Sequence, residues 1–574
     1  MAVENLITEH IDVWTSAEKT RSTSGRGSSK KLELYGVKKL RELILELAVR
    51  GKLVPQDPND EPASVLLERI AAEKTQLVKE KKIKKQKALP EVTEQEAPFN
   101  VPKGWEWTRL GNLSSDIHYG YTASAKPNSE GVRLLRITDI QNDKVNWGTV
   151  PACDITDEKA KSYLLENDDI LIARTGGTIG KSYLVENIDL QAVFASYLIR
   201  VKRVQAVYAP FTKVFLGSQL YWKQLIENSA GTGQPNVNAT ALKQLLFIVP
   251  PFNQQKRIVA KVDELMALCD QLEQQTEASI EAHQVLVTTL LDTLTNSADA
   301  DELMQNWARI SEHFDTLFTT EESIDQLKQT ILQLAVMGKL VSQDPNDEPA
   351  SELLKRIAEE KAQLVKEKKI KKQKALPPIS DDEKPFELPT GWKWCRLGEV
   401  INLVSGQHLK PSEYTENSEA NSVPYITGPA EFGSIYPTYS KYTLEKRALA
   451  QAGHILITCK GAGLGKLNRA KQTMAISRQL MAIEPVFLDS DFLYNVLDCQ
   501  YNYFQSKGVG IAIPGISRDD VTHMGVSLPP LNEQKRILVK LSELMNVCDL
   551  LKSRLIKSKN LQLHLTDAIV SRTV

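Results

Sequence analysis

The chain contains one long block twice. Residues 44–90 and 331–377, separated by a constant 287 positions, are identical at 40 of 47 positions. The same offset continues without a gap into Gly104-Trp105-Glu106-Trp107, which returns as Gly391-Trp392-Lys393-Trp394. A repeat of this length indicates a tandem duplication, so the fold must be built from two similar halves.

A second block repeats with a different offset of 279. The segment 250–258, Pro-Pro-Phe-Asn-Gln-Gln-Lys-Arg-Ile, returns at 529–537 as Pro-Pro-Leu-Asn-Glu-Gln-Lys-Arg-Ile. Between the repeated blocks lie two inserts, 106–249 and 393–528, which align only in scattered places and differ in length by eight residues. Similar frames around divergent inserts suit a scaffold that carries two readers of different targets.

Composition narrows the protein class. A chain of 574 residues is too long for one core and suggests three to five units. It has no apolar run of membrane-spanning length and no signal-like N-terminus, which favours a cytoplasmic protein. Six scattered cysteines without a C-x-x-C pair indicate neither a disulfide framework nor a zinc cluster. The net charge of −1 is not that of a protein that grips nucleic acid alone.

The repeated frames are predicted to be helical. Residues 1–32 have the composition of a flexible lead-in. Apolar spacing predicts a helix from about Leu34 to Ala48 that ends at Gly51, and a second helix that begins near Pro62. The second helix leads into a lysine run, Lys79 to Lys87, which returns as Lys366 to Lys374. This run either contacts phosphates or is a solvated helix end that leads into a linker.

A long helix follows each Pro-Pro pair. Steps of four and three residues predict coiled-coil seams at Ile258, Val262, Leu265, Cys269, Leu272, Thr276, Ser279, His283, Leu286 and Leu290, and at Ile537, Leu541, Leu544, Cys548, Leu551, Leu555, Ser558, Gln562, Leu565 and Ile569. The 44–90 block has no long helix before it, and the one it lacks stands at 531–571. The two ends of the chain are therefore predicted to meet and to close a pseudo-twofold ring.

Each insert reads as β-rich α+β material, with short segments of alternating apolar and polar residues such as 132–137, 169–173, 183–185 and 195–201. A glycine loop follows one strand of each insert, at 174–181 and 460–466. It resembles a phosphate-binding P-loop, but Thr175 stands where that motif needs glycine, so a nucleotide site is rejected. Exposed backbone amides and long cations here suit contact with phosphates or base edges, and a tight hairpin kept for folding is the alternative.

A proline loop precedes each Pro-Pro pair, at 230–238 and 509–517. Asn238 and Ser517 are predicted N-caps of short helices whose N-terminal ends can face an anion. Gln234 and Asn236 carry amides that suit adenine. The predicted DNA-binding residues of the two loops are Arg174, Thr175, Gly176, Gly177, Thr178, Lys181, Gly231, Gln234, Asn236 and Asn238 in the first insert, and Lys460, Gly461, Gly463, Lys466, Gly510, Ser517 and Arg518 in the second.

Signals of catalysis are absent from the sequence. Val249-Pro250-Pro251-Phe252 is similar to the Asn/Asp-Pro-Pro-Tyr/Phe loop of amino-methyltransferases, but a valine side chain cannot accept a hydrogen bond from an adenine amino group. The sequence has no cofactor fingerprint and no metal-spaced cluster, so neither catalytic residues nor metal ligands are predicted.

The doubled blocks, the Gly-Trp-x-Trp starts, the Ile-Leu-Ile-x-x-x-Gly-x-x-x-Gly-Lys segments and the Pro-Pro-x-Asn-x-Gln-Lys-Arg-Ile helix starts resemble specificity subunits of type I restriction–modification enzymes. The N-terminal region is similar to the IB family in particular. The resemblance covers essentially the whole chain.

The resemblance implies a fold of two α+β target recognition domains separated by two long antiparallel coiled-coil-like helices. The expected domains are an N-terminal helical region (1–101), recognition domain 1 (102–250), a central helical region (251–386), recognition domain 2 (387–529) and a C-terminal long helix (530–574). Each recognition domain is expected to read half of a bipartite asymmetric DNA site, with the helices setting the gap.

The same resemblance implies partners for a non-catalytic chain. These are double-stranded DNA, two modification subunits that bring AdoMet and methylate adenine, and two restriction subunits that bring ATP and Mg²⁺ for cleavage. No cofactor is expected on this chain and no membrane contact. Two other classes remain open: a scaffold whose inserts bind proteins, and a self-sufficient methyltransferase, which the missing motifs disfavour.

Overall fold

The computed structural model describes residues 3–21, 31–127, 130–227, 236–298, 300–461, 463–508 and 514–574. The chain divides into two compact units: unit 1 is Met1–Ser279 with Ser558–Val574, and unit 2 is Ile280–Lys557. In unit 1 the Tyr35 hydroxyl donates to Asp567 at 2.7 Å, and Lys559 lies 3.4 Å from the Glu18 carboxylate. The predicted meeting of the two ends is therefore confirmed within unit 1.

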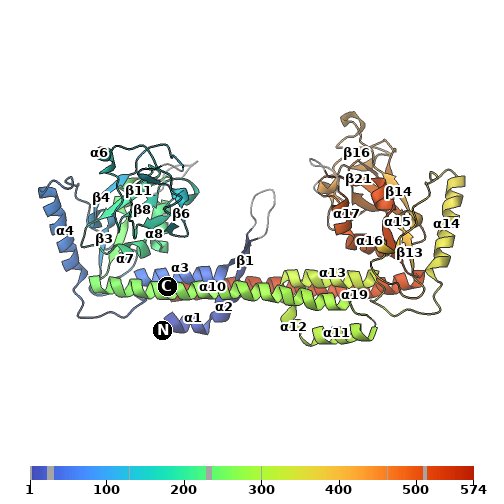
Figure 1. Cartoon of the computed structure of the whole chain (residues 1–574), viewed down its shortest axis with the longest axis horizontal. Coiled ribbons are helices and arrows are strands. Elements are labelled where there is room, and N and C mark those ends of the chain that lie inside the picture. Colours follow the sequence, from blue (N-terminus) through green and yellow to red (C-terminus); the bar gives the residue numbers. More distant parts are fainter. Residues whose placement is uncertain are drawn as a thin grey trace. The chain divides into compact units, whose positions relative to one another are not determined.

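The elements that begin in unit 1 follow in chain order (Figure 1). They are α1 (Val3–Glu9), α2 (Ile11–Ser16), β1 (Glu18–Arg21), β2 (Lys31–Leu34), α3 (Tyr35–Val49), α4 (Ala63–Lys79), β3 (Glu106–Arg109), α5 (Leu110–Leu113), β4 (Ser114–Tyr119), β5 (Arg133–Leu135), β6 (Ile140–Gln141), β7 (Lys144–Val145), α6 (Asp157–Ala160), β8 (Ile170–Ala173), β9 (Ser182–Leu184), β10 (Ala192–Phe194), β11 (Leu198–Arg203), α7 (Ala209–Phe215), α8 (Gln219–Glu227), α9 (Ala239–Gln244), β12 (Leu246–Val249) and α10 (Phe252–Thr295), which continues into unit 2.

Helix α3 forms because its apolar residues recur on one face, where Leu40, Leu43 and Ile44 are fully buried. It ends at Gly51, whose φ of +69° places it in the left-handed region that glycine adopts without strain. A Cβ at Gly51 would also lie 2.6 Å from Pro102. The helix end predicted from the sequence is confirmed.

The structure of the N-terminal segment contradicts the prediction of a flexible lead-in. Residues 3–21 are not a flexible lead-in, because they form α1, α2 and β1, and β1 pairs with β2. Trp14 of α2 is fully buried, and the amide of Gly36 on α3 donates to Ala17 O at 2.9 Å. A single large aromatic that packs on α3 holds this segment, and the polar composition around it hid that contact.

The first recognition domain contains an antiparallel four-stranded sheet in the order β4-β11-β8-β9. A separate parallel pair joins β5 to β10, and an antiparallel pair joins β3 to β12 at the base of the domain. The central strand β8 is buried at all four positions, so the alternation expected at 169–173 is not observed. It is covered on both faces, which removes the alternating signal.

The elements of unit 2 are α11 (Ala300–Glu312), α12 (Phe314–Leu317), α13 (Glu321–Val336), α14 (Ala350–Lys366), β13 (Lys393–Arg396), α15 (Leu397–Val400), β14 (Ile401–Ser405), β15 (Val423–Ile426), β16 (Tyr442–Thr443), β17 (Leu449–Ala450), β18 (Ile455–Thr458), β19 (Leu467–Arg469), β20 (Met474–Ile476), β21 (Leu480–Pro485), α16 (Ser490–Cys499), α17 (Tyr501–Lys507), α18 (Arg518–Thr522), β22 (Gly525–Leu528) and α19 (Leu531–Thr573), which ends in unit 1.

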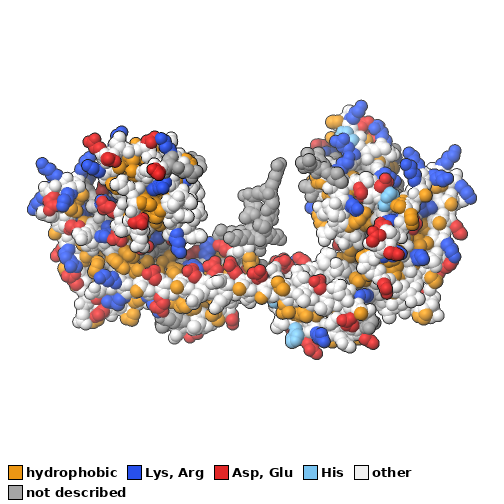
Figure 2. Space-filling model, viewed as in Figure 1, with side chains coloured by type: hydrophobic (Ala, Val, Ile, Leu, Met, Phe, Trp, Pro, Cys, Tyr) orange, Lys and Arg blue, Asp and Glu red, His pale blue; other side chains and the backbone are white. Residues whose placement is uncertain are grey.

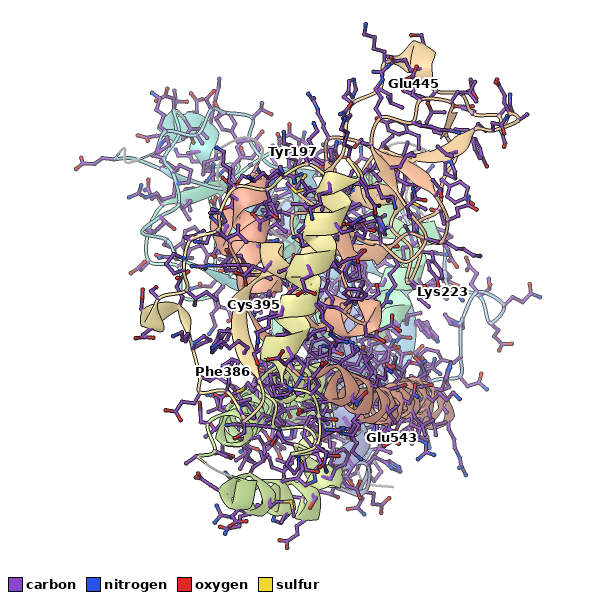
Figure 3. The ribbon with its side chains drawn as sticks, turned by 90° about the vertical axis from the view of Figure 1, so that its right-hand side faces the viewer. Tyr197, Lys223, Phe386, Cys395, Glu445 and Glu543 are labelled. Atoms are coloured by element: carbon purple, nitrogen blue, oxygen red, sulfur yellow. The ribbon has the colours of Figure 1, made fainter. Side chains whose placement is uncertain are left out.

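Unit 2 repeats the plan of unit 1. Its sheet has the order β14-β21-β18-β19, β15 and β20 form the parallel pair, and β13 pairs with β22. Figure 3 shows Cys395 of β13 beside α14, and the Cys395 thiol donates to Val526 O of β22. The described helices of the two units include none with both the length and the apolar character needed to cross a membrane.

Single contacts repeat as well. Arg257 of α10 pairs with Asp60 in unit 1, and Arg536 of α19 pairs with Asp347 at 2.6 Å in unit 2. The duplication of the sequence is therefore also a duplication of the contacts that join each long helix to the block before its recognition domain.

Two equivalent lysines, one in each half of the chain, attach the recognition domains to the helices that precede them. Lys74 Nζ donates to Gln86 Oε1 at 3.0 Å and to Gly111 O at 2.9 Å, and Lys361 Nζ donates to Gln373 Oε1 at 3.3 Å and to Gly398 O at 2.6 Å. Burial lowers the pKa of both ammonium groups to about 8. These lysines join α4 and α14 to the start of their domains.

The predicted seams are correct only in part. Ile258, Val262, Leu265 and Cys269 are buried as predicted, but farther along α10 Leu286 is exposed and Val287 is buried. The same one-residue slip occurs on α19, where Thr566 is buried and Leu565 is exposed. A straight helix of 3.6 residues per turn drifts by about 20° per heptad from a 3.5-residue repeat, so a fixed 4-3 pattern leaves the buried face.

Candidate nucleic-acid interface

The glycine loop and the proline loop of the first recognition domain lie against each other. Thr175 and Asn236 form an antiparallel β-bridge, and the Val237 amide donates to Arg174 O at 3.0 Å. The two loops are more than fifty residues apart in the sequence, so the sequence alone does not show that they are neighbours. The structure makes them one surface.

The Arg174 side chain lies at the centre of this surface. Its guanidinium stacks 4.5 Å from the centroid of the Tyr119 ring, and its Nε donates to Asn236 Oδ1 at 3.4 Å. The Tyr119 hydroxyl accepts from the Ala239 amide at 3.2 Å. These contacts fix the planar guanidinium, whose other N–H groups suit a guanine edge or a phosphate.

The other predicted residues of the first domain lie on the same two loops as Arg174 and Asn236. Gly176 has a φ of +74°, Gly177 faces open space, Thr178 Oγ1 donates to Thr175 O at 3.5 Å, and the Lys181 side chain is exposed. Asn238 caps α9 as predicted, because its Oδ1 accepts from the Ala241 amide at 2.8 Å. The predictions for Gly231 and Gln234 lie outside the described residues.

The second recognition domain joins its two loops in the same way with different residues. Lys460 forms the β-bridge with Gly515, and the Ile516 amide donates to Cys459 O at 3.0 Å. Cys459 therefore occupies the position of Arg174, and burial raises the pKa of its thiol to about 11. Lys460 is exposed in the position of Thr175, so the cation has moved by one residue.

The remaining predictions for the second domain have mixed outcomes. Gly461 has a φ of +92° with open space around its Cβ position, Gly463 packs against Pro429, and Lys466 is exposed. Arg518 donates to Ser405 Oγ at 2.8 Å. Gly510 lies outside the described residues.

Ser517 caps α18, as its predicted role requires. The expectation that this helix end can face an external anion stays a prediction, and the acidic side chains of its first turn oppose it. The Asp520 carboxylate already accepts from the Ser517 amide at 2.7 Å, and Asp519 adds a second negative charge to the first turn.

A third loop completes each surface and was missed from the sequence. The Arg174 amide donates to Tyr197 O at 3.1 Å, and the Cys459 amide donates to Gln479 O at 2.8 Å. Tyr197 is 65% exposed, an unusual exposure for a large aromatic, and Gln479 carries the two-sided amide that suits adenine. Tyr197 lies at the end of its domain far from the α3 and α10 helices (Figure 3). The sequence shows only an aromatic just before an apolar segment, which does not reveal that its ring is exposed.

The chemistry of these surfaces is that of recognition. They combine backbone amides, planar cations, amides and an exposed aromatic. Within the parts of the chain that the structure describes, no group of three or more His, Cys, Asp or Glu side chains has the arrangement to hold a metal ion.

Comparison with known proteins gives a consistent result. The family model described as "Type I restriction modification DNA specificity domain" matches residues 102–282 and 389–558. The chain is 41% identical over 620 aligned residues to the type I restriction enzyme EcoAI specificity subunit of Escherichia coli, with 100% of both chains covered. It is 42% identical over 604 residues to the EcoEI specificity subunit of the same organism, with 99% of both covered.

A solved structure shares the fold. A chain from work on complex assembly and conformational transition of the type I R-M system aligns with a TM-score of 0.50 and 21% identity, covering 83% of this chain and 99% of that one. The family match spans more than half of the chain, and the two relatives align over essentially all of it. The chain therefore belongs to the specificity subunits of type I restriction–modification systems.

Proposed function

We propose that each recognition domain reads one half of a bipartite, asymmetric DNA site and that the long helices set the gap between the halves. The observation that carries this proposal is the pairing of one scaffold with two different surfaces. The sheet order and the joined loops repeat, whereas Arg174, Asn236 and Tyr197 are replaced by Cys459, Gly515 and Gln479. Different side chains on one frame read different bases.

The helices have the length for a spacer. Helix α10 has 44 residues and α19 has 43, and each is therefore about 65 Å long at ~1.5 Å per residue. Half-sites on one face of a duplex lie about one turn, roughly 34–36 Å, apart. A pseudo-twofold cyclic arrangement of the two units is part of this proposal, since each long helix contributes residues to both units.

The chain directs chemistry that its partners perform. Two modification subunits with AdoMet methylate adenine, and two restriction subunits with ATP and Mg²⁺ cleave DNA. This division of labour is supported by the relatives, which are specificity subunits of restriction enzymes. The cofactors are assigned to the partners because the recognition surfaces described above carry no catalytic constellation.

An exchange of one recognition domain tests the proposal. Residues 106–249 are replaced by the equivalent segment of a relative such as the EcoAI specificity subunit, and genome-wide methylation mapping is compared with that of the parent. One half of the methylated site changes, while the other half and the gap remain. A change in both halves, an altered gap, or a site unchanged by the exchange contradicts the proposal, and the last result favours a protein-interaction scaffold.

A further inference from the structure

A groove in unit 1 separates the lysine-rich linker after α4 from the first recognition domain. It has a volume of about 1340 Å³ and is lined by linker residues 82–90, the edge strand β4, residues 200–203 of β11, the 161–169 turn and α9. The linker is fixed across it, because Gln86 Nε2 donates to Ser115 O at 2.7 Å. The groove therefore contains the lysine run to which the sequence assigned no single role.

The groove carries unneutralised positive charge. Five of its lysines have no side-chain hydrogen bond or ion pair with any residue that the structure describes: Lys84, Lys85, Lys87, Lys161 and Lys243. In Figure 2 Lys and Arg side chains gather at the left edge of unit 1, where α4 ends and the linker begins.

The carboxylates of the groove already have partners. Glu166, Asp168 and Asp169 pair in turn with Lys202, Arg203 and Arg200, Asp116 lies 3.0 Å from His118 Nδ1, and Glu73 accepts from the amides of Gln205 and Ala206. They hold the wall of the groove together, and of the five lysines only Lys243 acts on one of them, Asp116, so most of the lysine charge is available to an external anion.

The guanidinium groups of Arg200 and Arg203 add to the positive electrostatic potential of the groove. Arg200 is 3% exposed, and its Nε has no hydrogen-bond acceptor among the described residues. The Arg203 Nε is also buried without an acceptor there. A buried donor without an acceptor is costly, and an anion in the groove would lower that cost through its charge.

The groove begins where the recognition surface ends. His118 precedes Tyr119 on β4, and Thr240 and Lys243 lie on α9, the helix that Asn238 caps. Helix α9 has six residues and is therefore about 9 Å long. Because base pairs rise by about 3.4 Å, a strand that leaves the recognition surface reaches the groove within about three base pairs.

We propose, resting on the function proposed above, that this groove binds the phosphodiester backbone of duplex DNA just outside the half-site read by the first recognition domain. Lys84, Lys85 and Lys87 contact the phosphates from the linker side, and Lys161 and Lys243 contact them from the domain side. These contacts add affinity without reading bases.

The second copy provides an internal contrast. Its linker carries the same lysines, Lys371, Lys372 and Lys374. The strand registers place Asn402 and Glu484 where the first domain has Asp116 and Lys202, and Thr522 stands in the place of Lys243. At these three positions the wall facing the second linker has lost two cations and exchanged one carboxylate for another, so the local charge falls from +1 to −1 and the backbone contact is confined to the first half-site.

Two matched triple variants test the proposal in the full chain assembled with its modification subunits. One is Lys84→Gln, Lys85→Gln, Lys87→Gln, and the other is Lys371→Gln, Lys372→Gln, Lys374→Gln. The duplexes contain the DNA site that the complex methylates. One kind has flanks of roughly 10 base pairs on both sides, and the other kind has one flank removed at the edge of a half-site. Affinity is measured across a salt series.

The first variant is expected to lower the slope of log affinity against log salt by about 2 to 3, since each phosphate contact contributes about 0.9. It binds the full duplex more weakly than the parent does, and removal of the first flank costs the parent more than this, because the contacts of Lys161 and Lys243 are lost as well. The second variant keeps the parental slope. All exchanged side chains are exposed, and thermal unfolding confirms that both variants fold as the parent does.

Equal losses in both variants, or a parental slope in the first, overturn the proposal. The proposal also fails if the first variant loses as much affinity, relative to the parent, on the duplex without the first flank as it does on the full duplex. If the parent complex itself prefers no DNA sequence, the proposed function fails instead, and the two failures are therefore distinct.

Discussion

The buried ion pair of the first recognition domain shows how single residues distinguish two domains of one fold. Arg200 Nη1 lies 3.2 Å from Asp169 Oδ2, and both side chains are almost fully buried. Burial raises the pKa of the Asp169 carboxyl, and the Arg200 guanidinium opposes that rise. Strand register places Ala482 and His454 at these positions in the second domain. The shared fold therefore does not need the pair, which is specific to the first domain.

We expect Arg200→Met to destabilise the first recognition domain by about 3–5 kcal/mol, because it leaves the Asp169 carboxyl buried without its partner. Urea unfolding of the full chain measures the loss as an earlier transition of unit 1. The double variant Arg200→Met, Asp169→Leu recovers most of the stability, since an apolar pair replaces the ions. A single variant as stable as the parent would show that water reaches Asp169.

The one-residue slip of the seam on helix α10 predicts opposite outcomes for substitutions at two adjacent positions. Val287→Asp places a charge in the core of unit 2 and is expected to cost about 3 kcal/mol or more. Leu286→Asp, at the position that the 4-3 pattern assigns to the seam, is expected to change stability by less than about 0.5 kcal/mol. Thermal unfolding compares the two, and the reverse order would restore the predicted seam.

The elements that the sequence predicted well are those set by local rules. The end of α3 follows from the conformation of Gly51, and the cap of α9 follows from Asn238. The junction of Thr175 with Asn236 could not be predicted, because a β-bridge between distant loops depends on the packing of the whole domain. Tyr197 was missed for the same reason, since only the tertiary structure shows that it is exposed.

At the scale of the whole molecule, the exposed apolar residues of the long helices repeat with the duplication. Leu268 and Val547 are equivalent and are 45% and 51% exposed, and Leu286 and Leu565 are equivalent and are 50% and 46% exposed. Each unit therefore presents one residue of each kind. We expect these repeated exposed apolar side chains to contribute to two equivalent docking sites, one for each of the two modification subunits proposed above.

We expect Leu286→Asp with Val547→Asp, both in unit 2, to lower the number of bound modification subunits from two to one. Native mass spectrometry of the assembled complex counts them. The matched variant in unit 1, Leu268→Asp with Leu565→Asp, gives the same loss, and the four changes together remove both subunits. Two bound subunits in every variant would place the docking sites elsewhere.

The assignment of Ser558–Val574 to unit 1 has a consequence for biosynthesis. The ribosome makes the first recognition domain early, but the helix segment that contacts Tyr35 of α3 emerges only after the whole of unit 2. Unit 2 is continuous in the sequence and is available to fold before its neighbour is finished. A nascent chain that stalls late would therefore carry a completed second half and an open first half, whose bare apolar surface chaperones and proteases can recognise.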